Sequence, residues 1–272
     1  MKYKMQKALS LKKPQMKNEK LPISVVLLTR NEELNIKDCL QSCDFAKEFI
    51  VVDDGSTDKT IELAREFGAK VFNRSLDGDW GAQKMYAIEQ ASQPWLLLMD
   101  ADERVSAQLR QSIRQVFSEA REKKAYRFQR ENHFISGKAT HGILRPDWAL
   151  RLLPKEGARV IGKVHESVNS SFPIGQLKGR LIHFPYNSWD SYFRKFDKYT
   201  KIAAEKYLAE GRSCSFVKDI LLRPLWAFFK VYIINRGFLD GKLGFIFSVN
   251  HYFYTMAKYV RYYYLKNHGG KI

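Results

Sequence analysis

Apolar runs alternate with helical patterns along the first hundred residues. The apolar runs are short, as in strands that are covered on both faces, and they lie at residues 23–29, 49–52, 70–73 and 95–99. Between them, apolar side chains recur at steps of three or four, at residues 34–43, 59–67 and 82–91. This order of strand and helix predicts an α/β fold with a mostly parallel central sheet whose ligands bind beyond the carboxyl ends of the strands.

Polar motifs follow three of these strands directly. TRNEE ends the first strand, DDGSTD the second and DADE the fourth. Asp100 and Asp102 offer the hard oxygen ligands that Mg²⁺ or Mn²⁺ prefers, and such an ion can bridge a diphosphate. Asp53 and Asp54 can accept hydrogen bonds from a uracil imide or from ribose hydroxyls. The alternatives are a solvated turn or helix cap at Asp100 and Asp102, and an Asx turn at Asp54.

The second half has a more mixed pattern. Residues 107–123 and 188–207 have helical spacing, and strands are predicted at 126–130 and 150–153. Residues 216–235 are strongly apolar, but five charged residues or prolines interrupt them, which disfavours a bilayer span. Aromatic and basic residues together are typical of a segment at lipid headgroup depth. Packing against the body of the protein or a second copy is the alternative.

The net charge of +17 indicates a polyanionic partner. The first twenty residues carry seven lysines against Glu19, which predicts a flexible basic arm. Nucleic acid is disfavoured as the partner, because acids at a binding edge oppose contact with a phosphate backbone. Cys39, Cys43 and Cys214 form no CxxC pair, and no signal-peptide pattern is present, so we expect a reduced, cytosolic protein with buried cysteines.

Four segments together resemble a known family. LPISVVLLTRNEELNI, FIVVDDGSTDKT, DWGAQKMYAI and WLLLMDADERV are similar to the nucleotide-sugar domain of family 2 inverting glycosyltransferases, which have the GT-A fold. The resemblance covers Leu21 to Val105. RPDWALRLLPK, GKVHESV, LLRPLWAFF and GFLDGKLGF are most similar to bacterial enzymes that add glucose to the inner core of lipopolysaccharide or lipooligosaccharide. This resemblance implies UDP-glucose as donor, a divalent cation, a lipid-linked acceptor such as a core heptose, and a β linkage.

The resemblance also implies roles for individual residues. The nucleoside pocket would be lined by Thr29, Asn31 and Glu32 with Asp53 or Asp54. Lys84 would face the phosphates, Asp100 would lie near the ribose and metal, and Asp102 would be the more direct metal ligand. Met85 departs from the family pattern, because many relatives have asparagine at this position.

An inverting transfer also needs a base for the acceptor hydroxyl. Glu166, in GKVHESV, is the first candidate and Asp147 the second; the alternative for Glu166 is a surface or salt-bridged acid. His165 and His183 can each contact the metal or pyrophosphate, or serve as structural groups. Trp148 and Arg151, with His165, are predicted to bind acceptor through sugar stacking and anion pairing.

These patterns predict four regions: a basic arm (1–20), a nucleotide-sugar half (21–105), an acceptor half (106–187) and a helical region that associates with membrane or oligomerises (188–272). We expect a cytoplasmic protein, peripheral on the inner face of the bacterial cytoplasmic membrane. The rival functions are transfer to another lipid-linked or capsular glycan from a different UDP-sugar, nucleotidyl transfer, for which no glycine-rich loop is present, and a membrane scaffold without catalysis.

Overall fold

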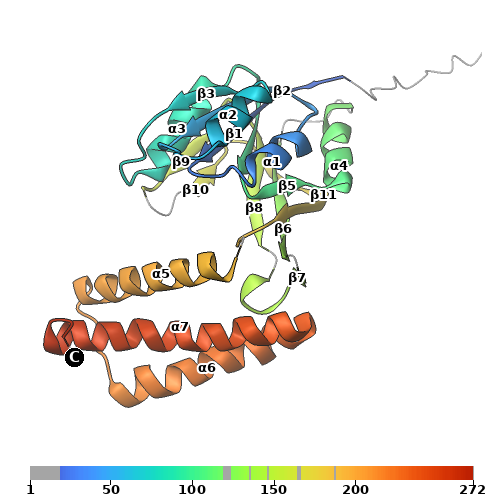
Figure 1. Ribbon diagram of the computed structural model, residues 1–272. Helices are drawn as coiled ribbons and strands as arrows, with labels where there is room; N and C mark the ends of the chain where they lie inside the picture. Colours follow the sequence, from blue (N-terminus) through green and yellow to red (C-terminus); the bar gives the residue numbers. More distant parts are fainter. Residues whose placement is uncertain are drawn as a thin grey trace, which may run out of the picture.

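The computed structural model of the protein describes residues 19–118, 124–134, 136–145, 147–163, 167–186 and 188–271. An α/β body lies above a layer of C-terminal helices (Figure 1). All but two residues of the predicted basic arm fall outside the described residues.

The body is built on one nine-stranded sheet, with a separate two-stranded ribbon. Its strands are β1 (Leu21–Thr29), β2 (Ala46–Asp53), β3 (Lys70–Asn73), β4 (Trp95–Asp100), β5 (Glu103–Val105), β6 (Ala125–Phe134), β7 (Gly137–Ala139), β8 (Trp148–Pro154) and β11 (Ile174–His183). β9 (Arg159–Ile161) and β10 (Ser167–Asn169) form the ribbon. The main path through the sheet is β3-β2-β1-β4-β8-β6-β11-β5, and β7 pairs with β6.

Parallel pairing runs through the N-terminal half of the sheet, as the alternating pattern predicts. β1 pairs in parallel with β2 and β4, and β2 pairs in parallel with β3. The register sets Thr29 opposite Asp53 and Leu28 opposite Asp100, so the predicted strand ends do share one edge. Beyond β4 the sheet is mixed, because β8 pairs antiparallel with both β4 and β6, while β6 and β11 are parallel.

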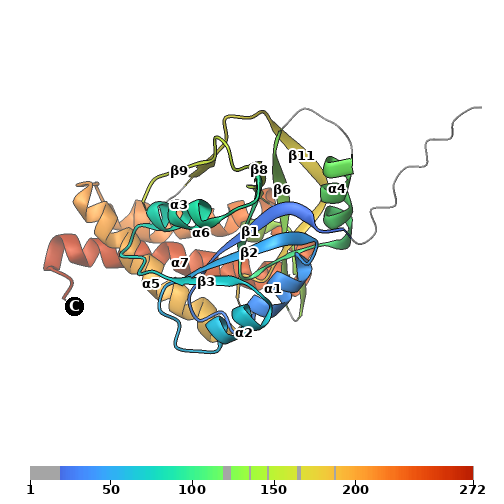
Figure 2. The same cartoon turned by 90° about the horizontal axis from the view of Figure 1, so that it is seen from above.

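Helices cover both faces of this sheet (Figure 2). They are α1 (Ile36–Ser42), α2 (Thr60–Glu66), α3 (Trp80–Gln90) and α4 (Ala107–Ser118). Val25 and Leu27 of β1 join the core under α1, α2 and α4, whereas Val26 joins the core under α3. This two-sided burial explains the continuous apolar run in β1. α3 begins two residues before its predicted start, because the Asp79 side chain accepts from the backbone N–H of Ala82 and caps the helix.

The C-terminal region is helical, as predicted. It comprises α5 (Trp189–Ala209), the π-helical turn η2 (Phe216–Leu222), α6 (Arg223–Phe229), a second π-helical turn η3 (Lys230–Ile234), the 3₁₀ turn η4 (Gly237–Asp240) and α7 (Gly241–His268). α7 lies between α5 and α6 (Figure 1). In the described part of the chain, no helix is both long and apolar enough to cross a bilayer.

Glycines in the motif GFLDGKLGF bring η4 and α7 against the body. A Cβ at Gly244 would collide with the carbonyl oxygen of Gly237. Gly142, in the 3₁₀ turn η1 (Gly142–Leu144), has a φ of +64°, and a Cβ there would lie 3.3 Å from the Cα of Gly237. Only glycine permits so close an approach of the two backbones. Asp240 secures the same contact, since its carboxylate accepts from the backbone N–H of His141 at 2.8 Å.

The cysteines are free thiols. Cys39 and Cys43 are buried, as predicted, and Cys214 is half-buried. Burial raises the pKa of Cys43 to about 12, so this thiol stays protonated and unreactive.

Candidate active site

A cavity of about 780 Å³ opens at the carboxyl ends of β1, β2 and β4. We call it the strand-end cavity. Its polar lining comprises Thr29, Arg30, Glu32, Asp54, Gln83, Lys84, Asp100, Asp102, Arg151 and Lys198, with Trp80 at one side. Six of the predicted binding residues therefore meet here: Thr29, Glu32, Asp54, Lys84, Asp100 and Asp102. Arg151, predicted to bind acceptor, joins them.

Asp53, Asn31 and Trp148 do not line this cavity. Asp53 is fully buried and accepts hydrogen bonds from the Thr29 hydroxyl at 2.9 Å and from the Ser56 backbone N–H at 2.7 Å. Asn31 has a φ of +55°, and its side-chain oxygen accepts from the Thr57 backbone N–H. Both residues shape the loops behind the cavity wall. Trp148 is exposed and packs against the Arg127 guanidinium, 5.2 Å from its ring.

Asp54 instead presents its carboxylate toward the cavity. Its Oδ1 accepts from the Leu76 backbone N–H at 2.8 Å, and its Oδ2 pairs with Arg30 at 2.9 Å. The structure thus separates the two adjacent aspartates: Asp53 is structural and Asp54 faces the space where a ligand would bind. Sequence alone left that choice open.

Asp100 is half-exposed and lies at the edge of a charge cluster whose other members, Arg151 and Glu103, are buried. Arg151 donates to the carboxylates of both Asp100 and Glu103, and its bond to Glu103 is 2.6 Å long. Glu103 is fully buried, and its Oε2 accepts from the Asp100 backbone N–H at 3.0 Å. Burial acts to raise the pKa of Asp100, but the charges of Arg151 and Lys84 lower it to about 2. Burial raises the pKa of Glu103 to about 7 despite the same arginine. Asp100 is therefore held ionised and fixed in place.

Asp102 has a different environment. Its Oδ1 is buried and has no hydrogen-bond partner within the described part of the chain. Its Oδ2 lies 3.4 Å from Nε2 of His183, which β11 brings beside the DADE turn through pairing with β5. His183 Nδ1 lies 2.8 Å from Oδ1 of Asn132, whose amide nitrogen donates to the Leu144 carbonyl oxygen. This orientation puts the imidazole hydrogen on Nδ1 and turns the Nε2 lone pair toward Asp102.

A carboxylate and an imidazole lone pair that face each other require a proton or a cation between them. An orphaned carboxylate oxygen beside them fits a divalent ion better than a proton alone. Among the described residues, no group of three or more His, Cys, Asp or Glu side chains can hold a metal. Two protein ligands are what Mg²⁺ uses when the substrate phosphates and water complete its shell. The residues present therefore fit a metal shared with a diphosphate.

Several cavity residues carried no motif in the sequence. Lys198 comes from α5, in the C-terminal region, and Glu103 was the unassigned last residue of DADE. The sequence did contain a hint for Glu103: it stands close to the apolar strand at residues 95–99, and a carboxylate that is buried beside such a strand needs a hydrogen-bond or charge partner. Lys198 had none, since only tertiary packing brings α5 to the sheet edge. Met85 packs on the core under the sheet, so its departure from the family pattern does not alter the cavity lining.

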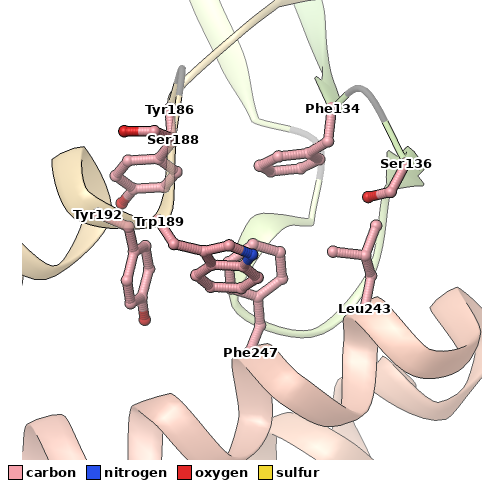
Figure 3. Close-up of a pocket in the computed structure, with 8 residues that line it drawn as sticks. All are labelled: Phe134, Ser136, Tyr186, Ser188, Trp189, Tyr192, Leu243 and Phe247. Atoms are coloured by element: carbon pink, nitrogen blue, oxygen red, sulfur yellow. The ribbon is translucent and has the colours of Figure 1, made fainter.

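Three further cavities continue from His183 toward the C-terminal helices. The basic cavity, of about 450 Å³, is lined by residues that include Arg130, Arg145, Asp147, His183, Lys230 and His251. The aromatic cavity, of about 270 Å³, lies among Phe134, Tyr186, Trp189, Tyr192, Leu243 and Phe247 (Figure 3). A cavity of about 300 Å³ shares lining residues with both. Neighbouring cavities of changing polarity therefore lie between His183 and the helical layer.

Of the two candidates for the catalytic base, the structure describes only Asp147. Glu166 and His165 lie outside the described residues. Asp147 is half-exposed and pairs with Arg130, with 2.8 Å between Oδ1 and Nε. Burial acts to raise the pKa of Asp147, but the Arg130 hydrogen bond and charge lower it overall. A carboxylate so stabilised is a weak base.

A parallel α/β arrangement of strands with an acidic turn and the polar strand-end cavity at its carboxyl edge is typical of nucleotide-binding proteins. The model of glycosyl transferase family 2 matches residues 24–166, which is more than half of the chain. The protein therefore belongs to glycosyl transferase family 2 and is a glycosyltransferase.

Relatives and solved structures are similar over different lengths. A lipopolysaccharide core biosynthesis glycosyltransferase, LpsC of Rhizobium meliloti, is 29% identical over 88% of this chain and 92% of its own. An uncharacterized glycosyltransferase of Rickettsia typhi is 26% identical over 88% and 85%. The S. aureus TarS structure with UDP-GlcNAc covers 86% of this chain and 81% of its own, with a TM-score of 0.46 and 16% identity. Glucosyl-3-phosphoglycerate synthase of Mycobacterium tuberculosis, solved with Mn²⁺ and UDP, covers 30% and 33%, with a TM-score of 0.27 and 29% identity.

Proposed function

We propose that the protein transfers glucose from UDP-glucose, with inversion, to a lipid-linked glycan such as a heptose of the lipopolysaccharide inner core. The main support for this proposal is that one cavity at the carboxyl edge of the sheet is lined by Asp54, Lys84, Asp100 and Asp102. The similarity to LpsC over most of both chains supports a role in lipopolysaccharide biosynthesis.

The donor would bind across the strand-end cavity. Asp54 accepts from the uracil or ribose, and Thr29 and Glu32 lie on the same wall. Lys84 and Lys198 supply positive charge for the diphosphate. Asp102 and His183 would hold Mg²⁺ or Mn²⁺, which when bound neutralises the negative charge that develops on the departing UDP. Asp100, fixed by Arg151, orients the ribose and the ligand set of the ion.

The acceptor hydroxyl would approach from the opposite face of the sugar. Its oxygen forms a bond to the anomeric carbon as the bond from that carbon to the diphosphate breaks, so UDP leaves and the configuration inverts. The hydroxyl proton passes to a carboxylate, and we assign this role to Glu166. Asp147 is the less suitable base, because Arg130 lowers its pKa.

Release of UDP is the direct test of this function. We expect the protein with Mn²⁺ or Mg²⁺ to release UDP from UDP-glucose when a core glycolipid is added. Release from another UDP-sugar or with a capsular acceptor would select the alternative transferase. Formation of pyrophosphate would indicate nucleotidyl transfer, and no release from any UDP-sugar would refute the proposal.

Replacing Asp54 with alanine should weaken donor binding. Loss of a charged hydrogen-bond acceptor for the nucleoside is expected to raise the dissociation constant of UDP about tenfold, as measured by calorimetry. Glu62→Ala, which removes an exposed acid of α2, is the matched control. An unchanged UDP affinity in Asp54→Ala would show that Asp54 serves only its bonds to Leu76 and Arg30.

We also infer that the C-terminal helices rest on an anionic membrane, which would make this a peripheral protein on the cytoplasmic face of the bacterial inner membrane. α6 and the π-helical turns beside it expose a row of apolar side chains: Leu222, Leu225, Trp226, Phe229 and Ile233. α6 is the helix farthest from the sheet (Figure 1). Lys218, Arg223, Lys230 and Arg236 lie exposed around this row. Apolar side chains ringed by basic ones suit insertion at headgroup depth.

Trp226→Ser combined with Phe229→Ser should reduce binding to phosphatidylglycerol vesicles at least tenfold in a sedimentation assay, because two large apolar side chains no longer enter the bilayer. Ile161→Ser, which removes an exposed apolar side chain of β9 in the body, should leave binding unchanged. If the row instead mediates contact with a second copy, the double variant will change the molar mass in light scattering and leave vesicle binding intact.

A further inference from the structure

The basic cavity has a composition that the transfer of a neutral hexose to a neutral hydroxyl does not require. We propose that it binds an anionic group, a phosphate or a carboxylate, carried by the acceptor glycan. The inference deepens the proposed function and rests on it, because it gives the chemical class of the acceptor.

The charges of the cavity are unbalanced. Arg130, Arg145 and Lys230 line it with one carboxylate, Asp147, and Arg130 already pairs with that carboxylate. In the described part of the chain, the side chains of Arg145 and Lys230 form no ion pair. Two cations facing one cavity repel each other, so an anion between them would be stabilised by both.

The cavity also offers a neutral polar group. Nδ1 of His251 is buried and lacks a hydrogen-bond partner among the described residues. Burial lowers the pKa of His251 to about 4, and Lys258 and Lys230 act in the same direction. The ring is therefore neutral at physiological pH and can exchange a hydrogen bond with a sugar hydroxyl. A cationic pair beside an unsatisfied neutral imidazole suits a sugar that bears an acidic substituent.

The walls that carry these cations are fixed relative to each other. Lys230 begins the π-helical turn η3, and such turns are frequent at functional sites. Arg145 directly follows η1. The Gly142 backbone N–H donates to the carbonyl oxygen of Asn235 at 2.9 Å, which ties η1 to the end of η3. The two cations thus belong to a preformed wall.

The position of the cavity favours the acceptor over the donor and over a lipid headgroup. It shares His183 with the Asp102 site, so a bound sugar would lie next to the reacting centre. The donor diphosphate already has Lys84 and Lys198 in the strand-end cavity. On its other side, a cavity that shares lining residues with the basic and the aromatic cavity adjoins the latter, whose rings suit the apolar part of a lipid-linked acceptor (Figure 3).

The test uses a soluble acceptor, so that no lipid headgroup is present. The full-length protein with UDP and Mn²⁺ is titrated with a deacylated, phosphorylated core oligosaccharide, with the same material after removal of phosphate, and with that product after reduction of its carboxyl groups. The variants are Arg145→Gln and Lys230→Gln, and the matched control is Lys178→Gln, which removes an exposed charge on β11.

We expect each cavity variant to raise the dissociation constant of the phosphorylated oligosaccharide about tenfold, and Lys178→Gln to leave it unchanged. The weaker binding of the two cavity variants, relative to the unmodified protein, should disappear once the oligosaccharide has lost the anionic group that the cavity binds. If it disappears on removal of phosphate, the group is a phosphate; if it disappears only on reduction of the carboxyl groups, the group is a carboxylate. Equal weakening for charged and uncharged forms would overturn the proposal. So would unchanged oligosaccharide binding by Arg145→Gln and Lys230→Gln together with weaker sedimentation of these variants with phosphatidylglycerol vesicles, which would indicate a headgroup site. No binding of the oligosaccharide by the unmodified protein would also overturn it. UDP release with the unmodified protein tests the transferase activity separately.

Discussion

Asp102→Ala is expected to lower sugar transfer by about a thousandfold or more while the protein stays folded. The carboxylate is one of two protein groups that fit the metal, and loss of charge stabilisation at a departing diphosphate corresponds to several kcal/mol of barrier. Its Oδ1 has no hydrogen-bond partner in the described structure, so its removal disrupts little. Thermal unfolding should therefore shift by no more than about 2 °C.

Two measurements separate this expectation from a general loss of structure. Calorimetric titration of Mn²⁺ into the UDP complex should show weaker metal binding in Asp102→Ala, and also in His183→Ala. Asp190→Ala, which removes an exposed acid of α5, should affect neither metal binding nor transfer. Retention of more than a tenth of the transfer rate by Asp102→Ala would contradict the assignment of this aspartate to the metal.

Arg151→Met should have the largest effect on stability. Arg151 is 6% exposed and is the buried cation between Asp100 and Glu103. Without Arg151, the buried Glu103 carboxylate keeps only Arg130 as a cationic partner, with 3.5 Å between Nη1 and Oε1, so we expect a cost at the lower end of the range of about 3–5 kcal/mol for a broken buried pair. For a chain of this length we expect the melting temperature to fall by roughly 10 °C. Transfer should fall as well, because Asp100 loses the group that holds it at the cavity.

The pH dependence of the stability of Arg151→Met tests whether the charge of Glu103 causes the destabilisation. The pKa of Glu103 in the folded protein is about 7, above its ordinary value of 4.5, so the folded state binds the proton more tightly than the unfolded state. Stability from this group is therefore greatest below pH 4.5 and is lost as the pH rises through 7. Removal of Arg151 raises the pKa further, so the loss of stability should be smaller at pH 5.5 than at pH 8.

A double variant completes the test. Arg151→Met combined with Glu103→Gln should be less destabilised than Arg151→Met alone at pH 8, because the orphaned charge is gone. A double variant as unstable as the sum of the two single variants would show that Arg151 acts by packing and not through its charge.

The order of elements in the first half could be predicted from the sequence because local physics decides it. A strand buried on both faces is mostly apolar, as residues 25–28 are, and crossover helices must present one apolar face to the sheet. The strand ends follow from the same rule. Thr29, Asp54, Asp100 and Asp102 share one cavity because parallel strands end at one edge.

The charge partners could not be predicted in this way. Arg151 was predicted to bind acceptor through anion pairing, and its partners Asp100 and Glu103 lie about fifty residues earlier in the sequence; β8 places it beside them through antiparallel pairing with β4. His183 reaches Asp102 only because β11 pairs with β5. Register between strands far apart in sequence depends on the whole sheet, and no local pattern encodes it.

The sequence by itself therefore determined the α/β order, the acidic strand ends and the amphipathic character of the C-terminal helices, because each depends on the periodicity of neighbouring residues. Tertiary structure decided which of the two adjacent aspartates lines the cavity, which residues neutralise Asp100 and Glu103, and which cavities Lys198 and Lys230 line. These depend on contacts between segments far apart in the sequence, and the free energy of a buried charge is set by those contacts.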